Sequence, residues 1–266
     1  ISIPTEIPIQ AFTPTPTSSQ VTIPTLGIGS IMNSEKDGMT ILYVPAGEFT
    51  MGIKDGGPDK EMPVHTVYLD AFWIDQTEVT NKQYAACVSD GGCTPPYDTS
   101  SHSRASYYGN SEFDDFPVIY VIWRQANAYC SWAGRELPTE AQWEKAARGT
   151  DERAYPWGND APNDTLLNYN RKVDDTTKVG SYETGKSFYG AYDMAGNVWE
   201  WVTSLYKPYP YDASDGRENM NSSNTRVVRG GSWVNDYLYV RSAIRYRGYP
   251  VSASGIDGFR CARSLP

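Results

Sequence analysis

Hydrophobic and polar positions follow recognisable periods in the first half of this 266-residue chain. They predict two strands, at 39–44 and 64–74, and three helices, at 80–88, 125–133 and 139–149. Thr80 and Thr139 are each followed three residues later by Gln, a capping box that opens a helix. Gly134 is a natural residue to end the middle helix. Beyond Gly149 the chain is aperiodic, so the domain should contain long irregular loops.

The first residues differ from everything that follows. Residues 1–36 are rich in Pro, Thr and Ser, which predicts an extended, solvated spacer ahead of a folded domain at 37–266. Such a spacer either separates a surface domain from an anchor or intracellular module, or is an inert tail. Because the chain starts at Ile1 without Met or a signal peptide, we expect a fragment or a processed product.

Composition narrows the class of protein. Aromatic residues make up 13% of the chain, including 20 tyrosines, which favours a loop-rich fold held together by aromatic packing. The net charge of −9 argues against a nucleic-acid partner, since such proteins carry a basic face. No apolar run approaches about 18 residues, so no direct membrane insertion is expected.

Residue types for hydrolytic catalysis are scarce. The only histidines are His65 and His102, and nothing in the sequence places a nucleophile beside His65. Zinc-protease, phosphate-loop and dinucleotide motifs are also absent from the sequence. These observations argue against a hydrolase.

The four cysteines are Cys87, Cys93, Cys130 and Cys261. No pair has the Cys-x-x-Cys spacing of a zinc site. Cys87 and Cys93 flank a Ser-Asp-Gly-Gly turn short enough to close a small loop, although four buried free thiols remain the alternative. Two disulfides would indicate an oxidising compartment, hence an extracellular or cell-surface location.

The segment from Trp233 to Ile256 is the candidate binding surface. Its tyrosines provide rigid amphipathic contact area, and its Asn, Ser and Asp residues provide adaptable hydrogen bonds. Strand alternation would place Tyr237 and Tyr239 on one face; the alternative is that the tyrosines pack the core. The candidate ligand-binding residues are Trp233, Val234, Asn235, Asp236, Tyr237, Leu238, Tyr239, Ile244, Tyr246, Gly248, Tyr249 and Ser252.

Four motifs follow one another along the chain: Leu-Pro-Thr-Glu-Ala-Gln-Trp-Glu at 137–144, Asp-Met-Ala-Gly-Asn-Val-Trp-Glu-Trp at 193–201, Gly-Gly-Ser-Trp at 230–233 and Gly-Phe-Arg-Cys at 258–261. In this order they resemble the formylglycine-generating enzyme, or sulfatase-modifying factor, family. The resemblance covers about 37–263 and implies an α+β, C-type-lectin-like fold, loop-rich with short helices and small twisted sheets. It also implies a disulfide between Cys130 and Cys261.

The chain has the motifs of the family but lacks the cysteine pair that its enzymes use. Enzymes of the family carry two cysteines between the last two motifs, which bind copper and oxidise a substrate cysteine to formylglycine. Residues 234–257 contain no cysteine, and Asn235, Tyr237 and Val240 lie where those thiols would be. Without thiolates no thiolate-bound copper is expected, so the sequence predicts a protein that is not an enzyme and has no catalytic residues.

Calcium is the cofactor that the resemblance implies, because relatives bind it in the matching loops. One site would use the Asn168 side chain, the Tyr169 carbonyl, Asp175 and the Thr177 carbonyl, and a second would lie around Asn197 and Glu200. The alternative is that these Asn and Asp residues form turns with their own backbone.

Among family branches, the variable proteins of diversity-generating retroelements fit the segment best. Positions 234–240, 244, 246, 248 and 249 resemble rewritten positions, and 241–243, 245 and 258–261 resemble framework. The leading hypothesis is a recognition protein for an unknown protein or surface ligand. The alternatives are a non-catalytic sensor fused to a kinase or membrane anchor, and an enzyme of unrecognised chemistry.

Overall fold

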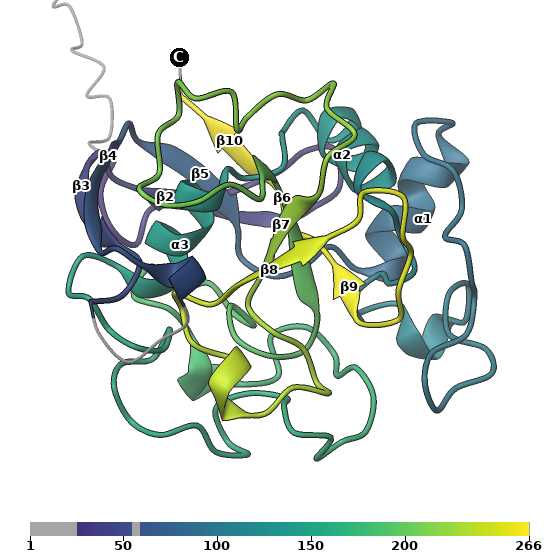
Figure 1. Cartoon of the computed structure of the whole chain (residues 1–266). Coiled ribbons are helices and arrows are strands. Elements are labelled where there is room, and N and C mark those ends of the chain that lie inside the picture. Colours follow the sequence, from purple (N-terminus) through teal and green to yellow (C-terminus); the bar gives the residue numbers. More distant parts are fainter. Residues whose placement is uncertain (1–25, 55–58, 266) are drawn as a thin grey trace, which may run out of the picture.

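The structure, a computed structural model, describes residues 26–54 and 59–265 (Figure 1). Most of the expected spacer, 1–25, lies outside the described residues. Strand β1 (Ile31–Asn33) pairs with β2 (Thr40–Val44), so the last part of the expected spacer belongs to a sheet. The folded domain therefore begins before the expected boundary at Asp37. A strand of three residues has too short a pattern to be predicted from the sequence, and only its pairing with β2 identifies it.

The strands form three small sheets, as expected for a loop-rich α+β fold. The first has the order β1-β2-β5-β10, where β5 is Phe72–Asp75 and β10 is Ala262–Ser264. The second pairs β3 (Gly47–Met51) with β4 (His65–Leu69). The third has the order β8-β7-β6-β9, built from β6 (Trp199–Leu205), β7 (Arg226–Arg229), β8 (Arg245–Gly248) and β9 (Asp257–Gly258).

The single strand expected at 64–74 is in fact two strands in different sheets. Leu69 of β4 pairs with Gly47, whereas Phe72 of β5 pairs with Val44. The segment from β2 to β3 and the segment from β4 to β5 therefore pass from one sheet to the other at the same place. Apolar residues flank this bend, with Leu69 before it and Phe72 after it, so the hydrophobic pattern does not reveal it.

Three α-helices lie where the sequence predicted them: α1 (Asn81–Ser89), α2 (Trp123–Trp132) and α3 (Glu140–Arg148). The capping boxes at Thr80 and Thr139 are both formed. Every residue of α3 is buried, and the helix contacts strands of two different sheets. Helix α3 is thus an internal element whose charged residues must find partners inside the protein.

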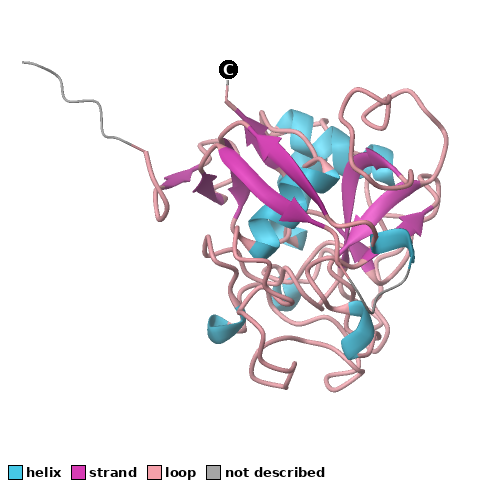
Figure 2. Cartoon of the chain, turned by 60° about the vertical axis from the view of Figure 1, so that its left-hand side comes forward, coloured by secondary structure: helices cyan, strands magenta, loops and turns pink. Residues whose placement is uncertain are grey.

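In the described part of the chain, the remaining regular elements are four short 3-10 turns in the loops. These are η1 (Asp59–Glu61), η2 (Ser111–Phe113), η3 (Glu183–Gly185) and η4 (Tyr237–Tyr239). Figure 2 shows the longer helices and the sheets in one half of the molecule, and long loops with short helical turns in the other half. Two disulfides close the framework, Cys87–Cys93 and Cys130–Cys261. Within the described part of the chain, no helix has the length and apolarity needed to cross a membrane.

Candidate functional site

A buried network of arginines and carboxylates supports the segment that the sequence singled out. Arg245 of β8 donates from Nε and Nη2 to the two oxygens of Glu140, each at 2.8 Å. Arg229 of β7 donates to Glu144 at 2.6 Å and reaches Glu140 at 3.2 Å. All four side chains are almost wholly buried. Helix α3 and the third sheet are therefore joined by charge-assisted hydrogen bonds.

The charges of this network compensate one another. Burial by itself raises the pKa of Glu144, but the guanidinium groups of Arg229 and Arg148 bring that pKa below its usual value. The carboxylate is thus ionised inside the protein, where removing one partner would leave an uncompensated charge.

Above this network, several large side chains of the segment are exposed. We call the tyrosine face the set that comprises Tyr237, Leu238, Tyr239, Tyr246, Tyr249 and Val251. Tyr237 and Tyr249 are 57% and 58% exposed, values that leave most of each ring open to a partner. Residues 237–239 form the turn η4 and not the expected strand, because the Asp236 side chain accepts the Leu238 N–H and caps it.

The tyrosine face has two parts, and η1 connects them. Arg241, which follows η4, donates to the Glu61 carboxylate at 2.7 Å. The Lys60 ammonium lies 5.0 Å from the centre of the Tyr246 ring on β8. The sequence did not indicate Lys60 or Glu61, because both lie about 180 residues away along the chain, as the separation of Glu61 and Arg241 shows.

Three of the expected ligand-binding positions do not offer a side chain to the surface. Trp233 and Ile244 are only 2% and 1% exposed, so their side chains are buried inside the protein. Gly248 lies against Trp201, and a Cβ there would be 2.3 Å from the indole ring. Gly248 is therefore a packing position that cannot vary freely.

The other expected positions are accessible to different degrees. Asp236 and Ser252 are exposed, whereas Val234 and Asn235 are half-buried. Asn235 Oδ1 accepts hydrogen bonds from the Ser232 N–H and hydroxyl, at 3.0 and 2.7 Å. Asn235 thus shapes the turn that leads into η4.

The residues of the first expected calcium site lie together, and their oxygens, apart from Asn168 Oδ1, already accept hydrogen bonds. Asn168 Nδ2 donates to the Asp175 carbonyl at 2.8 Å, and Asn197 Nδ2 lies 3.4 Å from the Thr177 carbonyl. The Tyr169 carbonyl accepts from the Lys172 N–H at 3.1 Å. Asn168 Oδ1 is buried and has no partner among the described residues.

The second expected calcium site is not assembled. Glu200 accepts two hydrogen bonds from Arg260, both at 2.7 Å, and one from the Trp143 indole at 2.8 Å. Asn197 points elsewhere, donating to Glu78 at 3.0 Å. Among residues 26–54 and 59–265, no three His, Cys, Asp or Glu side chains are grouped so that they could hold a metal ion.

The cysteines do not fit thiolate-bound copper. All four are consumed in Cys87–Cys93 and Cys130–Cys261, with none free. A disulfide sulfur is not the deprotonated thiolate that a soft metal requires. The alternative of four free thiols is therefore not what the structure shows.

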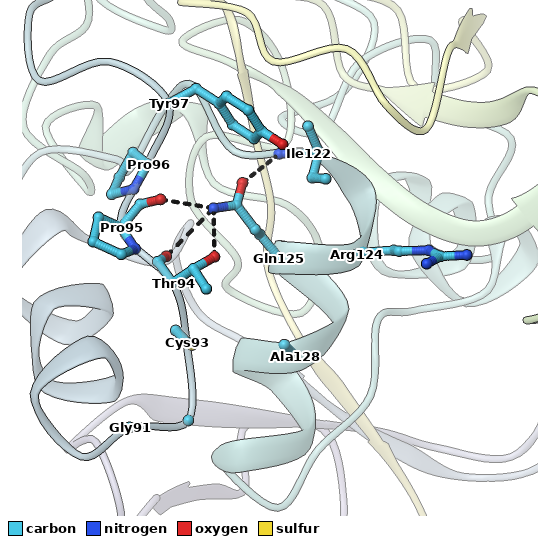
Figure 3. Close-up of a pocket in the computed structure, with 11 residues that line it drawn as sticks. Gly91, Cys93, Thr94, Pro95, Pro96, Tyr97, Ile122, Arg124, Gln125 and Ala128 are labelled. Atoms are coloured by element: carbon cyan, nitrogen blue, oxygen red, sulfur yellow. Dashed lines mark hydrogen bonds between the residues drawn. The ribbon is translucent and has the colours of Figure 1, made fainter.

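A cavity of about 540 Å³ lies between α2 and the loop after Cys93. Figure 3 shows Gln125 reaching across it from α2 to Thr94 and Pro95. The Gln125 amide donates to the Thr94 carbonyl and hydroxyl and to the Pro95 carbonyl, at 3.3, 3.0 and 2.8 Å. Because the Gln125 amide is already hydrogen-bonded to Thr94 and Pro95, its main role here is to anchor this loop to α2.

Comparison with known proteins defines the class. The family model described as the sulfatase-modifying factor enzyme 1-like domain matches residues 29–265. The chain therefore belongs to the sulfatase-modifying factor family, as its motifs predicted, and has the C-type-lectin-like fold.

Several relatives are named enzymes. The hercynine oxygenase of Mycolicibacterium smegmatis is 32% identical over 260 residues, covering 84% of this chain and 61% of that protein. The formylglycine-generating enzyme of Streptomyces coelicolor is 34% identical, covering 82% of this chain and 87% of that enzyme. The serine/threonine-protein kinase pkn1 of Chlamydia caviae is 32% identical over 240 residues, or 85% of this chain and 38% of the kinase.

Two solved structures share the fold. PvdO from Pseudomonas aeruginosa superposes with a TM-score of 0.72 at 25% identity, covering 91% of this chain and all of that one. Treponema denticola variable protein 1 has a TM-score of 0.69 at 23% identity, covering 89% and 99%. The expectation that the chain is not an enzyme is wrong: relatives at 32–34% identity are named as enzymes, and absence of one cysteine pair excludes only the chemistry of that pair.

Proposed function

We propose that this chain is the substrate-recognition domain of an enzyme of the sulfatase-modifying factor family, and that its substrate carries a quaternary ammonium group, as hercynine does. The observation that carries the proposal is the tyrosine face, where the Lys60 ammonium already lies 5.0 Å from the centre of the Tyr246 ring. Exposed tyrosine rings attract cations in this way, and clusters of them bind quaternary ammonium ligands.

The buried framework supports this role. A recognition surface gains affinity when its side chains are held in place before the ligand arrives. Arg245 fixes the base of β8 to Glu140 and also donates to the Lys60 and Lys207 carbonyls, at 3.0 and 2.9 Å. One buried guanidinium thus holds Tyr246 and Lys60, the two partners of the cation–π contact.

The proposal is confined to recognition. The chain spans 61% of the length of the Mycolicibacterium smegmatis hercynine oxygenase, and oxidation by thiolate-bound copper does not fit cysteines that are all in disulfides. The two disulfides support an extracellular or cell-surface location, because such bonds persist in oxidising compartments.

Isothermal titration of the chain with hercynine tests the proposal, with histidine as the matched ligand that lacks the trimethylammonium group. Each cation–π contact contributes roughly 0.5–1 kcal/mol at an exposed site. The variant Tyr237→Ala/Tyr239→Ala, or Tyr246→Ala alone, should therefore weaken hercynine several-fold, and histidine should bind more weakly than hercynine.

The matched control is Tyr68→Ala, which removes a 61%-exposed tyrosine from β4. This variant should bind hercynine as the unchanged protein does. Absence of measurable hercynine binding, or equal losses in Tyr68→Ala and the tyrosine-face variants, would reject the proposal.

A receptor role is a second candidate, favoured by the exposure of Asp236, Tyr237, Leu238 and Tyr239 on one turn. In a diversified receptor these codons would differ between sibling genes while Gly248, which Trp201 confines, stays fixed. Sequencing the segment in sibling cells distinguishes this candidate. In a kinase like pkn1, the same turn would instead sense a ligand for the attached catalytic domain, and its codons would be invariant.

A further inference from the structure

The carboxylate of Asp175 accepts four hydrogen bonds, three of them from a distant loop. Its Oδ2 accepts from the Ser101 hydroxyl at 2.7 Å, the Ser103 N–H at 2.8 Å and the Ser103 hydroxyl at 2.7 Å. Its Oδ1 accepts the Thr176 N–H at 2.7 Å. A calcium ion needs six to eight oxygen ligands at close range, so these donors would have to leave before the carboxylate could bind one.

A positive charge from the same loop stands beside this carboxylate. The Arg104 guanidinium lies 3.3 Å from Asp175 Oδ1 and donates to the Thr176 carbonyl at 3.0 Å and hydroxyl at 3.2 Å. The rings of Phe113 and Phe116 hold it at 4.8 and 5.0 Å. Arg104 therefore has a charge partner, a carbonyl ligand and two aromatic faces, which together form a built site for one cation.

The loop that delivers Arg104 is fixed at both ends. Near its start, the Cys87–Cys93 disulfide and the Gln125 amide hold Thr94 and Pro95 (Figure 3). Near its end, the Tyr107 hydroxyl donates to the Pro117 carbonyl at 2.6 Å. The loop that carries Arg104 is thus anchored at both ends, which holds the arginine beside Asp175.

The loop that contains Asp175 is also hydrogen-bonded to the segment that bears the tyrosine face. The backbone N–H groups of Asn170 and Arg171 donate to the carbonyls of Asn235 and Trp233, each at 2.7 Å. Asn170 and Arg171 both have positive φ, 52° and 54°, a conformation that costs free energy in non-glycine residues and persists only where neighbours enforce it. Holding Asp175 therefore helps to hold the turn that leads to η4.

We propose that the Arg104 guanidinium takes the place of a calcium ion at Asp175, so that loop 168–177 of this chain is ordered without metal. The ligand set expected for calcium is present in space, and its carboxylate carries an internal cation. The consequence is a recognition domain whose stability and surface are indifferent to calcium.

Thermal unfolding of the full chain in excess EGTA and in millimolar calcium chloride tests this inference. The unchanged protein should melt at the same temperature in both, and terbium, the luminescent probe for calcium sites, should show no saturable binding. A lower melting temperature in EGTA, or one saturable terbium site that Asp175→Asn abolishes, would overturn it.

Removal of the internal cation provides the reciprocal test. Arg104→Gln should lower the melting temperature in EGTA by roughly 5 °C, and calcium should restore part of that loss because the vacated carboxylate then accepts it. Arg124→Gln is the matched control, since Arg124 is an exposed arginine of α2 whose side chain points away from Gln125 and Thr94 in Figure 3. If Arg104→Gln does not fold, Ser103→Ala removes one donor from Asp175 and should gain the same response. If these variants fold and their melting temperatures are the same with and without calcium, the inference of a cation site at Asp175 is refuted.

Discussion

The substitution Arg245→Ala removes one partner of a buried ion pair and tests whether the network under the tyrosine face stabilises the fold. Arg245 is 1% exposed and engages both oxygens of Glu140 at 2.8 Å. After the substitution, Glu140 keeps only Arg229 at 3.2 Å and the Tyr209 hydroxyl at 3.2 Å. Breaking a buried pair from one side costs about 3–5 kcal/mol.

That cost is a large share of the total, because a domain is stable by only about 5–15 kcal/mol. Urea unfolding followed by tryptophan fluorescence measures it. With a slope of about 2–3 kcal/mol per molar urea, the midpoint should fall by roughly 1–2 M. Arg245→Lys should fall less, since it keeps the charge but loses the bidentate geometry.

The matched control is Lys178→Ala, which breaks an ion pair with Asp115 whose two side chains are 59% and 57% exposed. Surface pairs contribute about 0–1 kcal/mol, so the midpoint should hardly move. Equal small losses in Arg245→Ala and Lys178→Ala would refute the reasoning that the network is a structural support.

Two further predictions concern buried positions near the same core. Burial raises the pKa of Glu78 well above its usual value. Burial, with Glu200 nearby, raises the pKa of Asp193 to about 6. A carboxyl group whose pKa is raised by folding stabilises the folded protein at low pH, and this contribution is lost as the pH rises through the folded pKa. Glu78→Gln should therefore flatten the loss of unfolding free energy as the pH rises above the usual range of a carboxyl group, and a slope unchanged from the parent would contradict a raised pKa of Glu78. Gly248→Ala places a methyl 2.3 Å from Trp201 and should cost about 1–3 kcal/mol in urea unfolding, whereas Gly27→Ala, with no atom within 4 Å, should be near neutral.

Local signals in the sequence predicted much of the fold. The Thr80 and Thr139 capping boxes located two helices, and the ordered motifs identified the family, whose model matches 29–265. The bend between β4 and β5 was missed because it depends on which strands pair, and pairing is not local. The turn η4 was missed because a single aspartate cap at Asp236 outweighed the alternation of apolar residues.

The candidate site was predictable only in part. The exposed tyrosines were found from their composition, but burial of Trp233 and Ile244 and confinement of Gly248 depend on residues far along the chain. Likewise, the sequence indicated Asp175 as a calcium ligand but could not show that Arg104 lies 3.3 Å from it. Long-range partners decide what a local motif does.

Hydrogen exchange of the chain with and without saturating hercynine tests the central claim most directly, because it locates the ligand without assuming its site. We predict slower exchange at residues 237–239 and 245–251, with loop 91–97 around the cavity of Figure 3 unchanged. Slower exchange confined to 91–97, or no change anywhere, would contradict the assignment of the tyrosine face as the recognition surface.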